Sequence, residues 1–213
     1  GLDRSEEGIE MVEKAVVAQL EIHGHFAIHS EGTLWESILA LLFIDALCAP
    51  IPNVWPSPVL SCPIDYRTDV FTVPRKDIID QILKRIRDGE AELILLSNKA
   101  YYTNEIKGLV QSKYPFETLQ YVCKNFPGDK LAALLALILF ETKQKANGMP
   151  DLLIFPSKEK YFPIAFPNQI SYPIIFAELK TKNDFLSSSQ HCWLHRLSHL
   201  KLTAEIWPIE NTI

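Results

Sequence analysis

The sequence predicts an α/β fold, in which a small mixed sheet flanked by helices is interrupted by an all-helical block. Four short apolar runs, at about 26–28, 151–155, 174–179 and 204–207, have the length of strands. Between the first and second run, residues 75–146 show helical patterns only. At 213 residues the chain can bury a core in one large domain, or in a core with an insertion.

The first helix is predicted from Glu6 to about His23. Its apolar residues recur three or four positions apart and therefore share one face: Ile9, Val12, Val16 and Leu20. A short strand, Phe26–Ile28, should follow it.

The second helix is predicted from Leu34 to about Cys48. It is apolar on most sides, which is typical of a deeply buried helix. Ser30 and Thr33 are candidate caps, and Thr33 with Glu36 has the spacing of a capping box.

A stiff connector should follow, because prolines interrupt regular structure at positions 50, 52, 56, 58 and 63. Four helices are then expected at roughly 75–88, 103–113, 115–125 and 128–146. We expect a helical insertion at about residues 49–127, between elements of the α/β core.

The remaining core elements are two strands, Asp151–Phe155 and Ile174–Leu179, then a helix and a final strand. The helix should run from Leu186 to Leu200 and the strand from Ala204 to Trp207. The proline-containing stretch between the first two strands predicts a loop or an irregular hairpin.

Acids and a lysine stand at the ends of these two strands, in Gly148-Met149-Pro150-Asp151 and Glu178-Leu179-Lys180. Divalent cations prefer hard oxygen ligands, which the two acids could supply. Residues two apart on a strand point to the same face, so Lys180 should lie beside Glu178. The pattern is that of a metal-dependent phosphodiesterase, but it equally fits an exposed acid near a salt bridge at a strand edge.

The net charge of −5 counts against a nucleic-acid partner, although its distribution weakens the objection. Residues 141–201 carry eight Lys and Arg against five Asp and Glu, a local balance of +3. The longest uninterrupted apolar run, Leu131 to Phe140, is shorter than a membrane span requires. The four cysteines are scattered and predict thiols in a reducing compartment.

Five blocks of the sequence occur in the same order in one known family. They are His29-Ser30-Glu31-Gly32, then Pro63-x-Asp65-x-x-x-Asp69-x-Phe71, Gly148-Met149-Pro150-Asp151-Leu152, Glu178-Leu179-Lys180 with Asn183-Asp184, and Ser189-Gln190-x-x-Trp193-Leu194. From about Glu6 to Ile209 the chain resembles the VRR-NUC (virus-type replication-repair nuclease) domain of the Fanconi-anaemia-associated nuclease family. That family belongs to the PD-(D/E)XK superfamily, which has a restriction-endonuclease-like core.

The resemblance implies a structure-specific DNA nuclease of interstrand crosslink repair, which cuts near 5′ flaps and degrades from a 5′ end. It also implies Mg²⁺ or Mn²⁺, as two ions, because three carboxylates can clamp a pair of cations. We further expect a single VRR-NUC domain over residues 1–213, from the C-terminal part of a longer protein. Such a protein would act in the nucleus of a eukaryote, and otherwise in the cytoplasm.

The family's site residues can be carried to matching positions in this chain. The resemblance implies Glu31, Asp151 and Glu178 as metal ligands and Lys180 as the catalytic lysine. Lys143, Lys145 and Lys182 are candidate DNA-phosphate contacts, where the chain departs from the family's usual Arg and Gly positions.

Gln190 is a fourth catalytic candidate on grounds of its own. It shares a helix stripe with Leu186, Trp193 and Leu197 and should face the sheet, where a buried amide needs partners. The catalytic strand ends are the nearest ones, and a bond to backbone is the alternative.

Other readings stay open at this stage. One alternative is a four-way-junction resolvase, which would need a dimer. The helical insertion should prevent that dimer by covering the surface on which it forms. A second alternative is a non-catalytic DNA- or protein-binding scaffold of the same fold. His191, His195 and His199 form a helix stripe that suits zinc less well than solvent or phosphate. His23, His25 and His29 favour satisfied imidazoles, and Asp65 and Asp69 favour helix caps over metal ligands.

Overall fold

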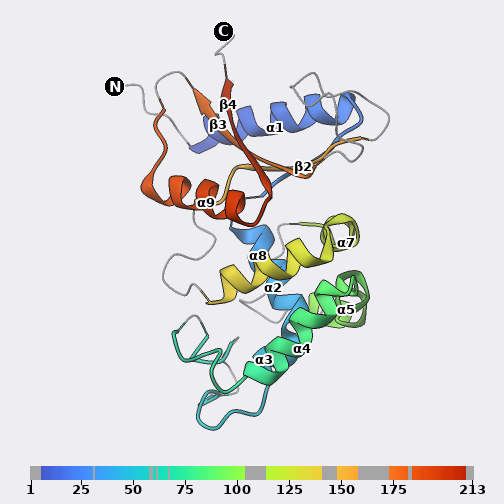
Figure 1. Cartoon of the computed structure of the whole chain (residues 1–213), viewed down its shortest axis with the longest axis vertical. Helices are drawn as coiled ribbons and strands as arrows, with labels where there is room; N and C mark the ends of the chain where they lie inside the picture. The colour runs from blue at the N-terminus through green and yellow to red at the C-terminus, as the bar shows by residue number, and fades with distance from the viewer. Residues whose placement is uncertain are drawn as a thin grey trace. The chain divides into compact units, whose positions relative to one another are not determined.

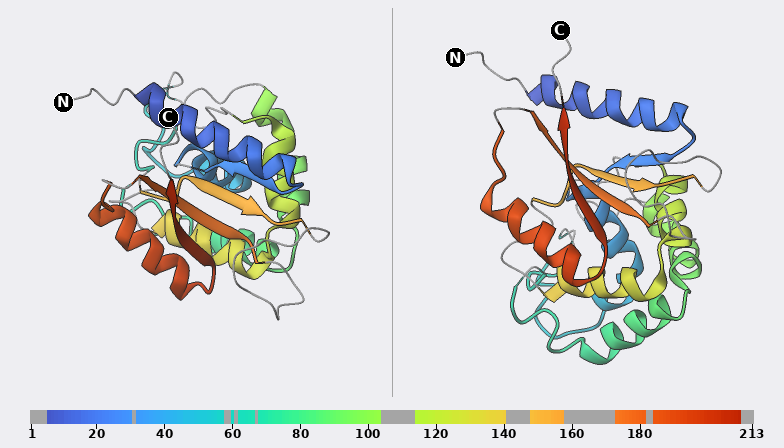
Figure 2. Two further views of the ribbon diagram at one scale, coloured as in Figure 1. Left: turned by 90° about the horizontal axis from the view of Figure 1, so that it is seen from above. Right: turned by 45° about the horizontal axis from the view of Figure 1, so that its top comes forward.

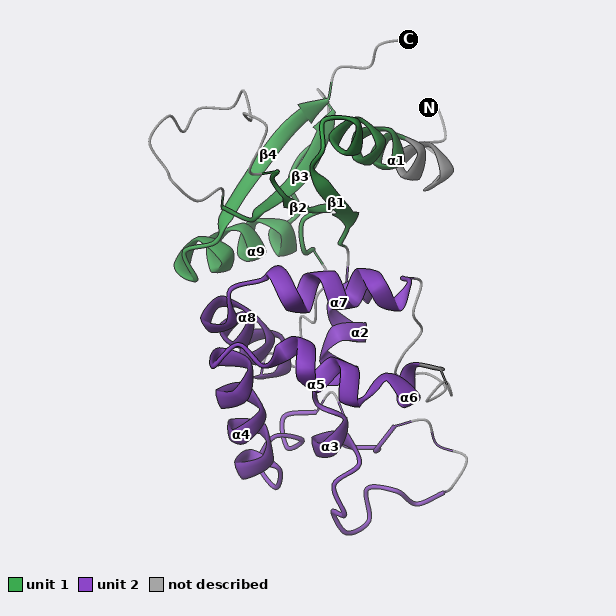
Figure 3. Cartoon of the chain, turned by 90° about the vertical axis from the view of Figure 1, so that its right-hand side faces the viewer, with its two compact units in different colours: residues 1–31, 148–213 green, residues 32–147 purple. Residues whose placement is uncertain are grey.

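The computed structural model describes residues 6–30, 32–57, 60, 62–66, 68–103, 114–140, 148–157, 173–181 and 184–209. The chain divides into two compact units (Figure 3). One, called here the sheet unit, comprises residues 1–31 and 148–213. The other, the helical unit, comprises residues 32–147. It extends beyond the expected insertion of 49–127 at both ends, because α2 and α8 pack on the helices between them.

The sheet unit contains a four-stranded mixed sheet in the order β1-β2-β3-β4 (Figure 1). Its strands are β1 (Phe26–His29), β2 (Leu152–Phe155), β3 (Ile175–Thr181) and β4 (Thr203–Ile209). The first two pairings are antiparallel, and β3 pairs in parallel with β4. A parallel pair needs a crossover connection, which helix α9 (Ser188–His199) provides.

The two faces of this sheet are covered by different helices, α1 (Glu6–Ile22) and α9 (Figure 2). The α1 face is apolar, with a cluster made by Leu20, Ala27, Leu152, Ile154, Ile175 and Ala177. Because side chains alternate along a strand, Glu178 and Lys180 lie on the opposite face, the one that α9 covers. On α9, Trp193 and Leu197 are buried. The candidate site therefore faces α9, and α1 secures the sheet from behind.

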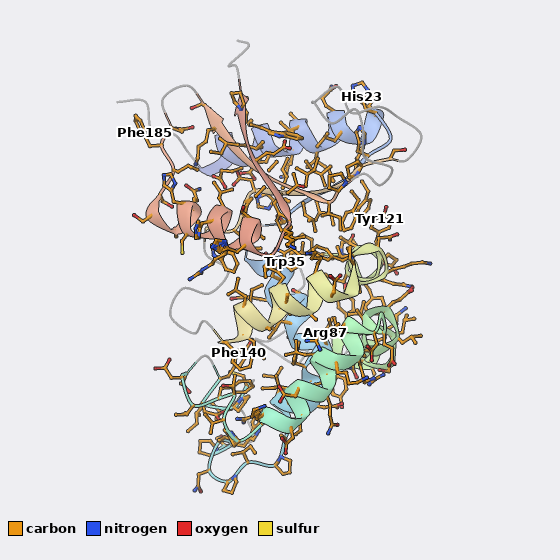
Figure 4. All side chains as sticks on the ribbon, in the orientation of Figure 1. His23, Trp35, Arg87, Tyr121, Phe140 and Phe185 are labelled. Atoms are coloured by element: carbon orange, nitrogen blue, oxygen red, sulfur yellow. The ribbon has the colours of Figure 1, made fainter. Side chains whose placement is uncertain are left out.

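The helical unit contains seven helices among the residues described. They are α2 (Thr33–Leu42), α3 (Ile44–Leu47), α4 (Lys76–Arg87), α5 (Ala91–Ser97), α6 (Lys99–Thr103), α7 (Phe116–Asn125) and α8 (Gly128–Phe140). Helix α2 lies at the centre of this unit, with Trp35 fully buried, and it contacts α5, α7 and α8 (Figure 4). The start of α8 approaches α4 so closely that a Cβ at Gly128 would lie 2.5 Å from the carbonyl oxygen of Ile86. Glycine permits this contact.

The predicted capping box at Thr33 and Glu36 is wrong. Helix α2 begins at Thr33 itself, Gly32 is the N-cap, and no side-chain hydrogen bond caps the helix. The hydroxyl of Thr33 lies 3.4 Å from that of Tyr114. The single helix expected over Leu34–Cys48 is also divided, because Phe43 interrupts it between α2 and α3.

The other predicted helices agree in part. Helices α4 and α7 are confirmed, whereas α5 was missed because its seven residues are too few to show a helical period. Residues 104–113 of the helix expected at 103–113, and residues 141–147 of the one expected at 128–146, lie outside the described residues.

Asp65 was predicted to cap a helix, and that prediction is wrong. Its two carboxylate oxygens accept hydrogen bonds from Arg75 Nη1 at 2.6 Å and Nη2 at 3.2 Å. Arg75 is fully buried and also donates to the carbonyl oxygens of Ala46 and Phe71. A buried guanidinium requires such partners, so Asp65 serves the interior of the helical unit.

The four cysteines, all described, form no disulfide. Burial raises the pKa of the Cys123 thiol to about 12. Within the part of the chain that the structure describes, none of the helices combines the length and apolarity needed to span a membrane.

Candidate active site

The start of β2 and the middle of β3 bring two acids together on one face of the sheet. Leu152 pairs with Ala177 in the antiparallel register, and continuing that register by one residue places Asp151 opposite Glu178. Directly opposed residues of antiparallel strands have Cβ atoms about 5 Å apart. Both residues are buried, Asp151 to 8% and Glu178 to 1% exposure. Two carboxylates twenty-seven positions apart in the sequence thus share one small region.

Asp151 is fixed by both neighbouring strands. Its Oδ2 accepts a hydrogen bond from the backbone N–H of Leu179 at 2.7 Å. On the other side, its backbone carbonyl accepts one from the N–H of Ser30, also at 2.7 Å. The hydroxyl of Ser30 donates to the carbonyl of Pro150 at 2.8 Å. Ser30 therefore anchors the Pro150–Asp151 segment, a role different from the helix cap predicted for it.

The turn before Asp151 depends on glycine. Gly148 has φ 84°, a left-handed conformation that other residues rarely adopt. A Cβ at this position would also come within 2.8 Å of the Cβ and Oγ of Ser189. The turn is thus packed directly on the first turn of α9, which brings that helix close to the strand carrying Asp151.

Glu178, Lys180 and Gln190 form a connected group. Glu178 Oε1 is 2.8 Å from Lys180 Nζ and accepts a hydrogen bond from Gln190 Nε2 at 2.5 Å. Lys180 Nζ also donates to Gln190 Oε1 at 3.3 Å. The Lys180 side chain keeps 17% exposure while Glu178 keeps almost none. The ammonium group is consequently held at the boundary between the buried acid and solvent.

Gln190 is placed by the start of α9. Ser187 is the N-cap of this helix, and its Oγ accepts from the N–H of Gln190 at 3.2 Å. In return, Gln190 Oε1 accepts from the N–H of Ser187 at 2.8 Å, which completes a capping box. The cap fixes the position of the amide that reaches Glu178. The structure thus places Gln190 beside the strand acids, on the face of α9 that the sequence stripe indicated.

The remaining predicted site residues lie outside the described residues. They are Glu31, Lys143, Lys145 and Lys182. Among the side chains that are described, no group of three His, Cys, Asp or Glu residues could hold a metal ion. The described donor set is therefore the pair Asp151 and Glu178. Two opposed carboxylates are hard oxygen donors and suit one divalent cation of the magnesium type.

Two histidines of the sheet unit, His25 and His29, have structural partners. His25 Nδ1 accepts a hydrogen bond from the backbone N–H of Ser157 at 3.1 Å. His29 Nε2 lies 2.6 Å from the buried Glu13 on α1. These contacts fit the predicted satisfied imidazoles. On α9, the rings of His195 and His199 lie with centroids 4.2 Å apart.

Sequence reasoning missed two residues that position the site, Ser30 and Ser187. The sequence predicts Ser30 only as a helix cap, since nothing local shows that its partner is 120 residues away. Ser187 could have been found, because Ser187-x-x-Gln190 at the start of an amphipathic pattern is the sequence form of a capping box.

Comparisons show that the chain is similar to known proteins in both sequence and fold. The family model described as the VRR-NUC domain matches residues 87–207. A Fanconi-associated nuclease 1 homolog of Oryza sativa subsp. japonica is 30% identical over 179 residues, which is 84% of this chain and 18% of the relative. The homolog of Schizosaccharomyces pombe is 30% identical over 202 residues, covering 92% of this chain and 26% of the relative.

Human Fanconi-associated nuclease 1 is 25% identical over 186 residues, covering 84% of this chain and 17% of that protein. The chain therefore spans about a quarter or less of the length of these three relatives. A crystal structure of paFAN1 bound to 2nt 5′ flap DNA with gap superimposes with a TM-score of 0.75 at 24% identity. It covers 94% of this chain and 35% of that one, which shows a common fold.

Proposed function

The chain belongs to the VRR-NUC domain family, and on that premise we propose that it is a metal-dependent, structure-specific DNA nuclease that hydrolyses phosphodiester bonds. The observation that carries the proposal is the position of Asp151 opposite Glu178, with Lys180 2.8 Å from the latter. The α-β-β-β-α-β order of the sheet unit also supports placing the fold in the PD-(D/E)XK superfamily.

The metal is proposed as Mg²⁺ or Mn²⁺, held by the carboxylates of Asp151 and Glu178. Glu31, two residues beyond the end of β1, is the proposed third ligand and the reason to expect two ions. When bound, the ions would supply Lewis-acid stabilisation of the phosphate oxygens and a water of lowered pKa.

Lys180 is proposed to act on the attacking water and the scissile phosphate. Its ammonium group is fixed by Glu178 and Gln190 but remains partly exposed, so incoming DNA can reach it. A positioned cation can orient the water through its lone pair and offset the charge that develops on the phosphate. The proton that the water loses would then pass to solvent, because the ammonium group is a donor only.

Gln190 is proposed as a positioning residue for the same reaction. Its amide donates to Glu178 and accepts from Lys180, so it fixes both side chains relative to each other. Groups that orient metal ligands commonly change metal affinity or activity by about 10- to 100-fold when removed.

The proposed substrate is branched DNA, in particular a 5′ flap, with degradation in the 5′-to-3′ direction. The support is the solved neighbour, whose crystal contains 5′ flap DNA, and the Fanconi-associated names of the relatives. Lys143, Lys145 and Lys182 remain proposed phosphate contacts. With this substrate we also propose a role in interstrand crosslink repair. The protein would act in the nucleus of a eukaryotic cell and otherwise in the cytoplasm.

The proposal is tested by incubating the chain with labelled flap, nicked, single-stranded and four-way DNA, each with Mg²⁺, with Mn²⁺ and with a chelator. We expect metal-dependent cutting near the flap, and loss of that cutting in Asp151→Ala, Glu178→Ala and Lys180→Ala. Light scattering should give a monomer of 24.3 kDa.

Other outcomes would assign a different function. A stable dimer that cuts four-way junctions symmetrically would indicate a resolvase. No cutting, together with no heat of Mn²⁺ binding in calorimetry, would indicate a non-catalytic scaffold. Full cutting by any of the three alanine variants would contradict the assigned site.

A further inference from the structure

Phe185 is the most exposed large hydrophobic side chain among those that the structure describes, at 90%. It projects from the segment between β3 and α9 (Figure 4). An aromatic ring gains considerable free energy when it leaves water, so a chain segment able to bend would normally bury it. Its exposure is therefore a feature that calls for a partner.

The described residues on either side of Phe185, Asp184 and Ser187, are held by hydrogen bonds. At one end, Asp184 Oδ2 accepts hydrogen bonds from the N–H of Thr181 at 3.0 Å and from its hydroxyl at 2.5 Å. The N–H of Asp184 in turn donates to the carbonyl of Thr181 at 2.9 Å. At the other end, Ser187 is held in the capping box of α9 by Gln190. Phe185 lies between these two hydrogen-bonded residues and is presented to solvent.

The same hydrogen bonds involve residues next to the candidate active site. Thr181 immediately follows Lys180 on β3, and Gln190 is the residue that donates to Glu178. Hydrogen-bonded residues on both sides of Phe185 are thus adjacent in sequence to the lysine or in contact with the buried acid. A group placed in this way can position a substrate as well as bind it.

An exposed aromatic ring offers nucleic acid a contact other than its phosphates. The ring of Phe185 is 90% exposed, whereas the carboxylates of Glu178 and Asp184 are engaged by neighbouring groups of the sheet unit. Stacking on an aromatic ring does not depend on charge, and every nucleobase offers a π-face to it. DNA with a flap or gap contains unpaired bases that are available for such a contact.

We propose that Phe185 is a stacking platform for an unpaired nucleobase next to the phosphate that is cut, an inference that rests on the proposed nuclease function. The ring binds the base and sets which phosphate reaches Lys180. It thereby contributes to selecting branched DNA over a continuous duplex, in which every base is already stacked.

The test compares Phe185→Ala, Phe185→Leu and Phe185→Tyr in the 213-residue chain. Leucine keeps an apolar side chain without a ring, and tyrosine keeps the ring. Steady-state cleavage of a 5′-flap substrate gives kcat and KM for each. In a second experiment, 2-aminopurine replaces the bases on either side of the cut. Its fluorescence is followed in a Glu178→Gln background, so that the DNA stays intact.

We expect KM to rise by about tenfold in the leucine and alanine variants, the loss of one base–aromatic stack. The tyrosine variant should resemble the wild type. Quenching of 2-aminopurine should occur with phenylalanine and tyrosine and be absent with leucine. An abasic nucleotide at the quenched position should abolish the difference in KM between wild type and the leucine variant.

Wild-type KM and quenching in the leucine variant would overturn the stacking role and leave a protein partner as the occupant of the ring. A rise in KM in the tyrosine variant as large as that in the leucine variant would overturn the stacking role as well. These results differ from failure of the proposed function, in which the wild-type chain itself would cut no substrate with either metal.

Discussion

Each compact unit contains an acid paired with a base, and the two pairs differ in how completely the protein encloses them. In the helical unit, the guanidinium of Arg75 is fully buried, binds both oxygens of Asp65 and lies 4.2 Å from the centre of the Phe71 ring. In the sheet unit, Lys180 meets Glu178 through a single ammonium group that keeps contact with solvent.

The difference indicates that one pair stabilises the fold and that the other can take part in the proposed reaction. The planar fork of Arg75 is matched by fixed acceptors, so this pair can only hold the helical unit together. The ammonium of Lys180 is a point charge that shares its contacts with a glutamine amide and can exchange them for a substrate. We therefore expect changes at Arg75 to affect folding, and changes at Glu178 and Lys180 to affect cleavage.

The largest effect is expected from Glu178→Gln. The substitution keeps the shape of the side chain and its acceptor but removes a metal ligand. Since a bound metal supplies several kcal/mol in the transition state, cleavage should fall by at least about a thousandfold. The melting temperature should stay the same or rise, because the carboxylate of Asp151 lies opposite and the two charges repel. Single-turnover cleavage and a thermal melt measure both. A large drop in melting temperature would assign Glu178 to the fold rather than to the site.

Arg75→Met is expected to do the reverse. It leaves Asp65 without its partner in a buried place and should lower the free energy of unfolding by about 3–5 kcal/mol. Cleavage per folded molecule should not change. Urea denaturation measures the loss, and alkylation of Cys123, which is 4% exposed, reports opening of the helical unit.

A matched control for Arg75→Met is the double variant Asp65→Leu/Arg75→Met, which should recover much of the stability because no charge remains unpaired. If the double variant is no more stable than the single one, packing of the arginine side chain rather than charge pairing holds this unit together.

Gln190→Ala and Ser187→Ala sharpen the contrast within the sheet unit. Both break the capping box and should each cost about 1 kcal/mol in the free energy of unfolding. Only Gln190→Ala also removes the contacts to Glu178 and Lys180, so it alone should slow cleavage, by about 10- to 100-fold. Cleavage assays and denaturation of both variants separate the two roles. Equal cleavage by the pair would show that Gln190 serves the helix and not the site.

Among the variants expected to slow cleavage, Gly148→Ala should have the smallest effect. The left-handed backbone and the contact with Ser189 should together cost about 1–3 kcal/mol in stability. Cleavage should fall a few-fold as the Asp151 turn shifts. Adding Ser189→Gly removes the clash but leaves the backbone strain, so it should restore stability only in part. Melting temperatures of the wild type, the single variant and the double variant provide the comparison. Full recovery of the melting temperature in the double variant would mean that the positive φ of residue 148 costs no stability.

How much the sequence could predict follows from the range of the interactions involved. Helix α1, the four strands and α9 were all predicted within a few residues, because their periods and apolar runs are local. The start of α2 was misplaced because Gly32 replaces the expected side-chain cap. Asp65 was misassigned because a single acid in a turn favours capping, and its partner Arg75 becomes apparent only in three dimensions.

The candidate site shows the same limit. Alternation along β3 was enough to place Lys180 beside Glu178, and the helix stripe was enough to direct Gln190 toward the sheet. The anchoring of Asp151 by Ser30 could not be foreseen, since it depends on the register between β1 and the residues before β2. Pairings between distant segments leave no periodic signal in the sequence.

The most direct measurement is an anomalous difference map from a crystal of the chain grown with Mn²⁺. We expect a peak within about 2.0–2.6 Å of carboxylate oxygens from both Asp151 and Glu178, as oxygen ligation of a divalent cation requires. The peak should disappear in an Asp151→Asn crystal. A manganese ion bound elsewhere, with Lys180 still paired to Glu178 and the two acids without metal, would contradict the proposed nuclease site.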